Sequence, residues 1–259
     1  MIGIFDSGLG GLTAVKELLR LMPTEDLVYF GDTGRVPYGT KSRATIIQYA
    51  RQDVAFLNSK GVDAILVACG TVSTTALEVL QKESKIPVVG VVEPACRAAV
   101  NATKNGSIAV IGTIATIRSG AFPDMLKDLR PDLKVYEQAC PLFVPLVENG
   151  VVDKDDPIAR LAVERYLGRF KDSDVDTMIL GCTHYPLLSE VISDILPGVT
   201  LINTGYEAAK ALCEGRSADG TGNTRYYVSD DPEMFITSAS RFLGRDVTGQ
   251  VSYVDIGAY

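Results

Sequence analysis

The sequence predicts an α/β protein with two mostly parallel sheets, each covered by helices. Short apolar runs rich in β-branched residues alternate with longer stretches of helical period, which is typical of βαβ units. Hydrophobic residues make up 46% of the 259-residue chain, which is enough to form buried cores. The predicted strands are too many for one open sheet of ordinary size, so we expect two sheets.

The predicted strands are short and apolar, and stretches of helical period fill the gaps between them. We expect strands at residues 2–5, 27–31, 63–68, 88–92, 107–112, 134–139, 176–181, 199–203 and 225–228. We expect helices at about residues 11–22, 42–59, 73–83, 94–104, 114–129, 156–170, 186–195, 205–214 and 231–243.

The predicted chain path crosses twice between two domains. The crossovers fall near Glu93 and Gly205, so the first domain comprises residues 1–92 and 206–259 and the second comprises residues 93–205. No segment resembles a long flexible linker, so we expect the two domains to pack closely.

Composition argues against several classes of partner. The formal net charge is -7 and the 25 Lys and Arg residues are scattered, so the basic stripe that nucleic acid or an anionic membrane requires is missing. The longest apolar runs are far shorter than the ~20 residues of a membrane-spanning helix, and the N-terminus lacks a signal-peptide pattern. We expect a soluble, cytoplasmic protein.

The five cysteines lie far apart in the sequence and form neither a CxxC pair nor a Cys/His cluster at zinc spacing. We therefore expect reduced thiols, with neither a disulfide framework nor a metal site. For Cys96, Cys140 and Cys213, the simplest interpretation is that of small buried hydrophobic residues.

An internal repeat distinguishes the other two cysteines. Residues 62–71 read VDAILVACGT and residues 175–184 read VDTMILGCTH, so each copy is an apolar strand that leads to a cysteine and a threonine. A short repeat of a common pattern can also arise by chance. If it is genuine, two buried parallel strands deliver Cys69 and Cys182 to the carboxyl edges of their sheets, where α/β proteins bind ligands.

The position of these two thiols suggests proton transfer. Each cysteine precedes a predicted helix, and a helix N-terminus favours the thiolate, so we expect pKa values lowered toward neutrality. His184, the only histidine, lies two residues after Cys182 and is a candidate acid/base helper, although a lone histidine is often structural. Asp6 ends the first strand and either caps a turn or, if Cys69 is close in space, is the counterpart of His184.

Two loops complete the candidate site. The DSGLGG segment at 6–11 does not fit the GxGxxG spacing of dinucleotide sites, but its turn and Ser7 suit a small carboxylate. The PYGTKS segment at 37–42 reads as a turn before a Ser-capped helix, and it could equally line the site.

Seven motifs occur in order over essentially the whole chain: FDSGLGGLT at 5–13, VPYGTKS at 36–42, ACGTVS at 68–73, VVEPA at 91–95, IGTIATIRSGAF at 111–122, PLFVPLVENG at 141–150 and LGCTHYPLL at 180–188. Together they resemble the glutamate racemases of the aspartate/glutamate racemase superfamily. The resemblance implies two flavodoxin-like domains related by a pseudo-two-fold axis, with the active site in the cleft between them.

The resemblance also implies a cofactor-independent racemase that supplies D-glutamate for bacterial peptidoglycan and commonly forms a homodimer. As thiolates, Cys69 would deprotonate D-glutamate and Cys182 would deprotonate L-glutamate, with Asp6 and His184 tuning the two thiols. The substrate would bind hydroxyl and backbone N–H groups in a site poor in Arg and Lys. The implied substrate-binding residues are Ser7, Pro37, Tyr38, Gly39, Gly70, Thr71, Thr113, Thr116, Glu148 and Thr183.

One departure from the family pattern keeps alternatives open. The first cysteine is usually followed by an asparagine that touches the substrate, whereas this chain has Gly70. An aspartate or broad-specificity racemase is therefore an alternative, as is an inactive small-molecule-binding regulatory protein. A pyridoxal-dependent racemase would need a Schiff-base lysine, and no lysine stands out near a strand end.

Overall fold

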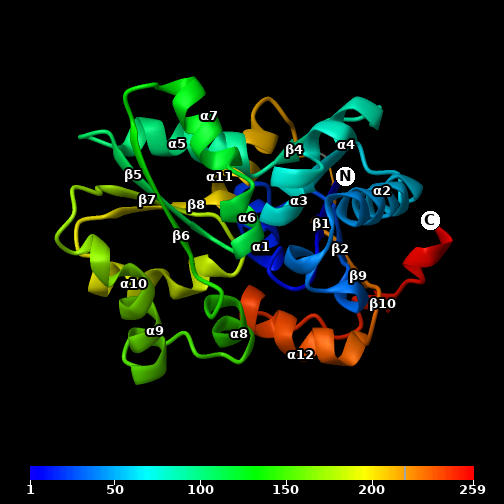
Figure 1. The fold of residues 1–259 in the computed structure, drawn as a ribbon. Coiled ribbons are helices and arrows are strands. Elements are labelled where there is room, and N and C mark those ends of the chain that lie inside the picture. Colours follow the sequence, from blue (N-terminus) through cyan, green and yellow to red (C-terminus); the bar gives the residue numbers. More distant parts are fainter. Residues whose placement is uncertain (219) are drawn as a thin grey trace.

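The computed structural model describes residues 1–218 and 220–259, and in it the strands form two separate parallel sheets (Figure 1). The six-stranded sheet has the order β10 (Val251–Tyr253), β9 (Thr224–Val228), β2 (Leu27–Gly31), β1 (Ile2–Asp6), β3 (Ala64–Val67) and β4 (Val88–Gly90). The four-stranded sheet has the order β6 (Lys134–Ala139), β5 (Ser107–Gly112), β7 (Thr177–Leu180) and β8 (Thr200–Asn203). The α/β class with two parallel sheets is confirmed.

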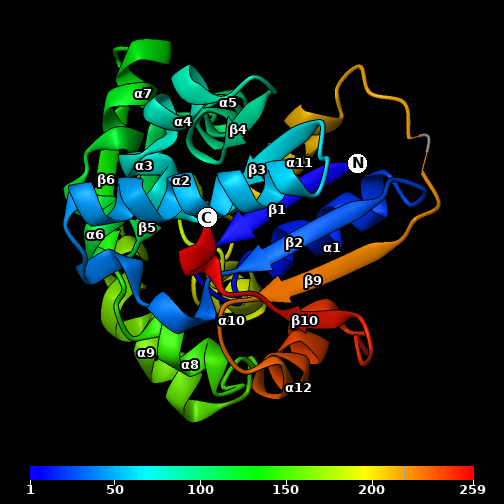
Figure 2. The ribbon, with the colours of Figure 1, turned by 90° about the vertical axis from the view of Figure 1, so that its right-hand side faces the viewer.

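The two sheets repeat one topology. The order β2-β1-β3-β4 in one matches β6-β5-β7-β8 in the other, which is the order at the start of flavodoxin-like sheets. β3 and β7, the strands of the internal repeat, therefore occupy equivalent places. Because pairing is parallel, the carboxyl ends of each sheet share one edge, as Figure 2 shows for β1, β2 and β9.

Helices cover both faces of each sheet. On the six-stranded sheet, α1 (Leu12–Leu21), α11 (Thr204–Cys213) and α12 (Pro232–Leu243) cover one face, and α2 (Arg43–Ser59), α3 (Gly70–Thr75) and α4 (Leu77–Glu83) lie on the other. On the four-stranded sheet, α5 (Val92–Ala102) and α7 (Ala121–Leu129) cover one face, and α9 (Pro157–Leu167) and α10 (Ser189–Ile195) the other. Both faces of the central strands are therefore buried, which explains their continuous apolar runs.

One hydrophobic core runs through both halves of the molecule. Ile4 of β1 and Leu180 of β7 belong to the same cluster of buried side chains, together with residues of α1, α9 and α12. The opposite faces have separate cores, with Phe5 packed toward α2 and Ile179 packed toward α5. The shared core holds the two sheets against each other, with their carboxyl edges close together.

Several details differ from the predicted elements. Strand β10 and the helix α8 (Phe143–Glu148) were not expected; β10 has only three residues, and Pro145 argues against a helix unless, as here, it lies in the first turn where its missing N–H is not needed. The helix expected at 114–129 divides into α6 (Ile114–Arg118) and α7 because Gly120 has φ +70°.

The helix expected at 73–83 also divides, into α3 and α4, and it begins earlier, at Gly70. Single-turn 3-10 helices, which the sequence pattern does not reveal, occur at Thr33–Arg35, Tyr38–Thr40, Gly168–Phe170, Tyr185–Leu188 and Ile256–Ala258. Those at Tyr38–Thr40 and Tyr185–Leu188 flank the candidate site.

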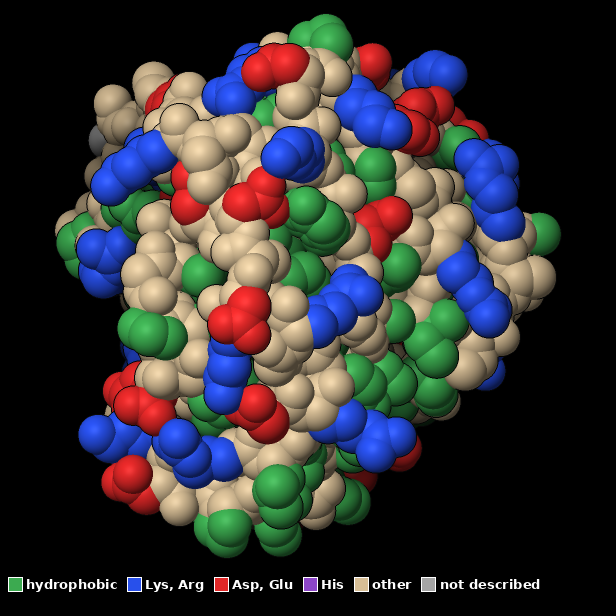
Figure 3. Space-filling view, turned by 60° about the vertical axis from the view of Figure 1, so that its left-hand side comes forward, with side chains coloured by type: hydrophobic (Ala, Val, Ile, Leu, Met, Phe, Trp, Pro, Cys, Tyr) green, Lys and Arg blue, Asp and Glu red, His purple; other side chains and the backbone are tan. Residues whose placement is uncertain are grey.

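All strands of the six-stranded sheet lie in residues 1–92 and 206–259, and those of the other sheet lie in 93–205. The domain boundaries themselves stay a prediction. Among the described residues, every helix is too short or too polar to traverse a lipid bilayer. On the face seen in Figure 3, Lys and Arg side chains are interspersed with Asp and Glu.

Candidate active site

The carboxyl edges of both sheets contribute to one cleft of about 790 Å³. Cys69 follows β3 and Cys182 follows β7, so the equivalent strands supply one thiol each. Both side chains are nearly buried, at 5% and 7% exposure, yet both line the cleft. The thiols are therefore shielded from bulk water and accessible to a small molecule in the cleft.

The structure brings together almost all of the residues proposed from the sequence. Every one of them except Asp6 lines the cleft: Ser7, Pro37, Tyr38, Gly39, Cys69, Gly70, Thr71, Thr113, Thr116, Glu148, Cys182, Thr183 and His184. Asp6 lies buried behind the wall, at the end of β1, and its Oδ2 accepts a hydrogen bond of 3.0 Å from the N–H of Gly8.

Glycines allow the walls to approach each other closely. A Cβ atom on Gly70 would lie 2.7 Å from the carbonyl oxygen of Gly181, and one on Gly10 would lie 2.1 Å from Thr183 Oγ1. The hydroxyl of Thr13, in α1, also donates to the carbonyl oxygen of Thr183 at 3.0 Å. The glycines of the 6–11 segment therefore make room for the loop that carries Cys182, and the loops beside the two thiols are in direct contact.

A chain of three side chains leads away from Cys182. His184 Nδ1 lies 3.9 Å from Cys182 Sγ, and His184 Nε2 lies 2.9 Å from Glu148 Oε1. Burial alone would lower the pKa of His184, but hydrogen bonds to Cys182 and Glu148 outweigh it and raise the pKa to about 10. With both nitrogens protonated, the imidazolium places a positive charge beside the Cys182 sulfur.

Cys69 has the opposite electrostatic surroundings. Its Sγ lies 3.4 Å from Ser7 Oγ, and Asp6 is the nearby charge. Burial, followed by repulsion from the Asp6 carboxylate, raises the pKa of Cys69 to about 12. The expectation that a helix N-terminus lowers this pKa is therefore wrong: α3 has only six residues, and desolvation outweighs its dipole.

One oxygen of the Asp6 carboxyl group, Oδ1, is buried beneath the cleft and has no hydrogen-bond partner among the described residues. Burial raises the pKa of Asp6, and the charge of His184 opposes that rise. Asp6 therefore interacts electrostatically with the helper of the other thiol as well as with Cys69, an arrangement that the sequence did not predict.

The comparisons with known proteins agree with this architecture. The model of the Asp/Glu/Hydantoin racemase family matches residues 11–212. The chain belongs to this family. Glutamate racemase of Geobacter metallireducens is 45% identical, with 99% of this chain and 97% of the relative covered, and that of Thermus thermophilus is 48% identical, with 93% and 91% covered. A crystal structure of glutamate racemase from Francisella tularensis in complex with D-glutamate has a TM-score of 0.91 at 38% identity, with 100% of this chain and 98% of that chain covered.

This member of the racemase family has cationic groups on its cleft wall that sequence reasoning missed. Lys41 and Arg118, both exposed, line the cleft, so the expected site poor in Arg and Lys is incorrect at its rim. Lys41 falls within the PYGTKS motif and Arg118 within IGTIATIRSGAF, but only the fold turns both toward one opening. An anionic ligand would meet positive charge at the entrance.

Two of the predicted substrate-binding residues in this racemase-family site form hydrogen bonds within the protein. Thr113 caps α6, because its Oγ1 accepts from the N–H of Thr116 at 3.2 Å. Tyr38 directs its hydroxyl away from the cleft to the buried Asp32 and Asp53. Among the described residues, no group of three His, Cys, Asp or Glu side chains is placed to hold a metal ion.

Proposed function

We propose that this protein interconverts L-glutamate and D-glutamate by proton transfer between the substrate α-carbon and two thiols, without an organic cofactor or a metal. One observation carries the proposal: equivalent strands, β3 and β7, each supply one nearly buried cysteine to the same cleft. Racemisation needs one group that removes the α-proton and a second that protonates the opposite face, and two such strand ends suit this geometry.

On the Cys182 side, the protein supplies the charge that a thiolate needs. The raised pKa of His184 keeps its imidazole protonated at neutral pH, and Glu148 holds the far nitrogen of the ring. Cys182 as thiolate then removes the α-proton of L-glutamate. The electron pair of the C–H bond stays on the α-carbon as a carbanion until a proton arrives from Cys69.

On the Cys69 side, the substrate itself brings the missing charge. The raised pKa of Cys69 means that its form before substrate binds is the thiol, which is the form that donates a proton to the carbanion. In the reverse direction, the α-ammonium group of bound D-glutamate offsets the nearby Asp6 carboxylate and favours the thiolate at Cys69. Asp6 is thus proposed to tune Cys69, as His184 tunes Cys182.

The remaining wall is proposed to bind the two carboxylates of the substrate. Ser7, Thr71, Thr116 and Thr183 offer hydroxyl groups at the cleft, and the Pro37–Gly39 segment offers backbone groups. These dipoles are fixed before the substrate arrives, which stabilises developing charge at low reorganisation cost. Lys41 and Arg118 would attract the anion to the entrance.

Glutamate is favoured over aspartate by the comparisons, since the 45% and 48% identical relatives named above are both glutamate racemases. In its biological role, the enzyme would supply D-glutamate for peptidoglycan in the bacterial cytoplasm.

We also propose that each chain has two domains, with boundaries near Glu93 and Gly205, and that two chains form a homodimer. Light scattering at several protein concentrations tests the dimer.

The deciding experiment follows the ellipticity of L-glutamate, and separately of L-aspartate, in reducing buffer without added cofactor. We expect the wild-type protein to abolish the glutamate signal, whereas Cys69→Ala and Cys182→Ala do not. Cys213→Ala is the matched control, because that cysteine lies in α11 and does not line the cleft.

Each alternative has its own result in this assay. Turnover of aspartate in preference to glutamate would identify the protein as an aspartate racemase, and turnover of both would indicate broad specificity. A flat trace for both, with ligand binding retained, would support the inactive binding protein. Visible absorbance of the purified protein that disappears with borohydride would support pyridoxal chemistry. Undiminished turnover by either cleft-cysteine variant would contradict the two-thiol mechanism.

A further inference from the structure

A second group of buried charges lies beside the cleft and takes no part in the proton transfer. Asp32 follows β2 and Asp53 lies in α2, and both carboxylates have 0% exposure. Arg35, in the 3-10 turn at Thr33–Arg35, lies between them. Charged side chains are almost never fully buried unless they are paired or hydrogen-bonded.

Arg35 uses its whole guanidinium group to hold this cluster together. Its Nε donates to Asp32 Oδ2 at 2.6 Å, and its Nη2 donates to Asp53 Oδ1 at 3.0 Å. Its Nη1 donates to Gln52 Oε1 at 2.5 Å, and its Cζ lies 4.0 Å from the ring centre of Tyr49. Such a multiply bonded fork fixes orientation more tightly than a single ion pair does.

Tyr38 connects the cluster to the cleft. Its hydroxyl donates to Asp32 Oδ2 and also lies 3.2 Å from Asp53 Oδ2, while Pro37 and Gly39, on either side of it, line the cleft. A single hydroxyl proton cannot serve two ionised carboxylates at once. Burial, and then the charge of Asp32, raise the pKa of Asp53, which favours the neutral acid and lessens the competition between the two carboxyl groups for the Tyr38 hydroxyl.

The remaining carboxylate oxygen ties the cluster to the end of β9. Ser229 Oγ donates to Asp32 Oδ1 at 2.7 Å and accepts from the N–H of Gly34 at 2.9 Å. Every oxygen of the two carboxyl groups therefore has a hydrogen-bond partner. A fully satisfied polar network of this kind specifies one arrangement of the segments that it joins.

We propose that Asp32, Arg35 and Asp53 are positioning residues that act through Tyr38 to hold the Pro37–Gly39 segment against the cleft, and thereby set the affinity of the site for its substrate. The inference rests on the proposed function, since affinity is measured there by racemisation. Packed hydrophobic side chains are often at least as stabilising as a buried charge cluster, so the fixed geometry, rather than stability, is the advantage of this one.

The first test is Tyr38→Phe, which removes the hydroxyl and leaves the ring. We expect KM for glutamate to rise about tenfold. The variant loses one hydrogen bond to a charged group, and the size of the rise is limited by the free energy of that single bond. We expect kcat to change less than about twofold, because the thiols lie on other loops. Tyr49→Phe is the matched control: its ring packs 5.5 Å from that of Tyr38, and it does not line the cleft.

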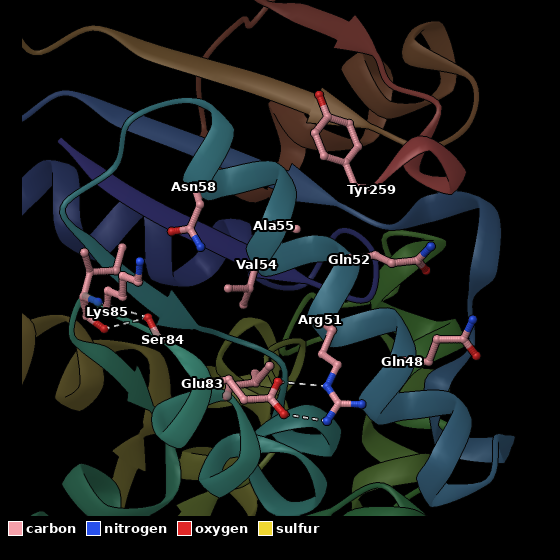
Figure 4. A pocket seen from close by; sticks show the side chains of 12 residues that line it. Gln48, Arg51, Gln52, Val54, Ala55, Asn58, Glu83, Ser84, Lys85 and Tyr259 are labelled. Atoms are coloured by element: carbon pink, nitrogen blue, oxygen red, sulfur yellow. Dashed lines mark hydrogen bonds and ion pairs between the residues drawn. The ribbon is translucent and has the colours of Figure 1, made fainter.

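The second test is Arg35→Gln, with Arg51→Gln as its control. Arg51 lies on α2, two residues before Asp53, but it pairs with Glu83 at the surface, in the pocket between α2 and α4 that Figure 4 shows. We expect Arg35→Gln to raise KM and to lower the melting temperature, since it leaves buried Asp32 without its cation. Arg51→Gln should change neither quantity by much, because exposed ion pairs contribute little.

The outcomes separate this inference from the proposed function. A raised KM with a near-wild-type kcat in Tyr38→Phe supports the positioning role. An unchanged KM in Tyr38→Phe overturns it, even if the melting temperature falls, because a merely structural cluster would affect stability alone. If the wild-type protein racemises neither amino acid, the proposed function fails and this inference fails with it.

Discussion

Gly70 and Gly181, the neighbours of the two cleft cysteines, meet so closely that a Cβ atom on Gly70 would stand 2.7 Å from the carbonyl oxygen of Gly181. Real Cβ atoms do not approach a backbone oxygen to that distance, and a backbone atom cannot swing aside as a side-chain terminus can. The glycine is therefore a packing requirement of this cleft. Where the resemblance to the family implies an asparagine that touches the substrate, this chain has a glycine that lets the two walls approach each other closely.

The first prediction follows from that contact. Gly70→Asn should destabilise the protein by about 1–3 kcal/mol, as overpacking does, and should lower kcat/KM because the walls must separate. Urea unfolding and the ellipticity assay measure the two effects. For stability alone, Gly39→Ala is the control, since its new Cβ would be at an ordinary 3.8 Å from Ala115. Higher activity in Gly70→Asn would mean that the family amide had simply been lost.

Local sequence pattern was sufficient to predict the two thiols and most of the fold. Cys69 and Cys182 each follow a buried strand, and the repeated segments around them occupy equivalent places in the two sheets. Helix and strand periods reflect nearest-neighbour burial, so they can be read from a single chain. The short β10 and the proline-containing α8 escaped because their signals span too few residues.

Long-range contacts explain what the sequence could not predict. Glu148 lies 36 residues from His184 in sequence, and the approach of Gly70 to Gly181 depends on how two sheets are oriented. The pKa shift of Cys69 was predicted in the wrong direction. The position of a cysteine before a helix can be read from the local sequence, whereas its burial and its distance from Asp6 depend on the fold. Site electrostatics are therefore the part of such a protein that needs a structure.

The thiol reactivity of Cys69 gives the second prediction. Because burial and Asp6 raise its pKa to about 12, its alkylation by iodoacetamide should be slow at pH 7 and should rise about tenfold per pH unit up to that pKa. Peptide-resolved mass spectrometry separates Cys69 from the other cysteines. Asp6→Asn, which removes the nearest negative charge, should accelerate the reaction at a given pH. A plateau of the rate near pH 8 would contradict the raised pKa.

The third prediction concerns charge at the cleft entrance. Lys41→Ala and Arg118→Ala should each raise KM for glutamate a few-fold with little change in kcat, because both groups are exposed and act by long-range attraction. The effect should shrink as salt rises above about 0.15 M. Lys85→Ala, which removes a positive charge from the pocket between α2 and α4, is the control. A salt-independent loss in either cleft variant would indicate a direct bond to the substrate instead.

The fourth prediction is the pH dependence of stability from His184. Its folded pKa of about 10 lies above the ordinary value of 6.5, so the folded state holds a proton that the unfolded state releases between those values. The stabilisation is fully present below pH 6.5 and is lost as pH rises toward 10. The difference in unfolding free energy between wild type and His184→Gln should therefore be largest at pH 6 and decline steadily to pH 10.

Urea unfolding at each pH measures that difference, and Glu148→Gln tests its origin. The glutamine can still bond to the ring but carries no charge, so it should lower the folded pKa of His184 and move the loss of stability to lower pH. A difference between wild type and His184→Gln that stays constant from pH 6 to 10 would show that His184 is neutral in the folded protein. In that case the imidazolium could not assist Cys182, and the asymmetry between the two thiols would need another source.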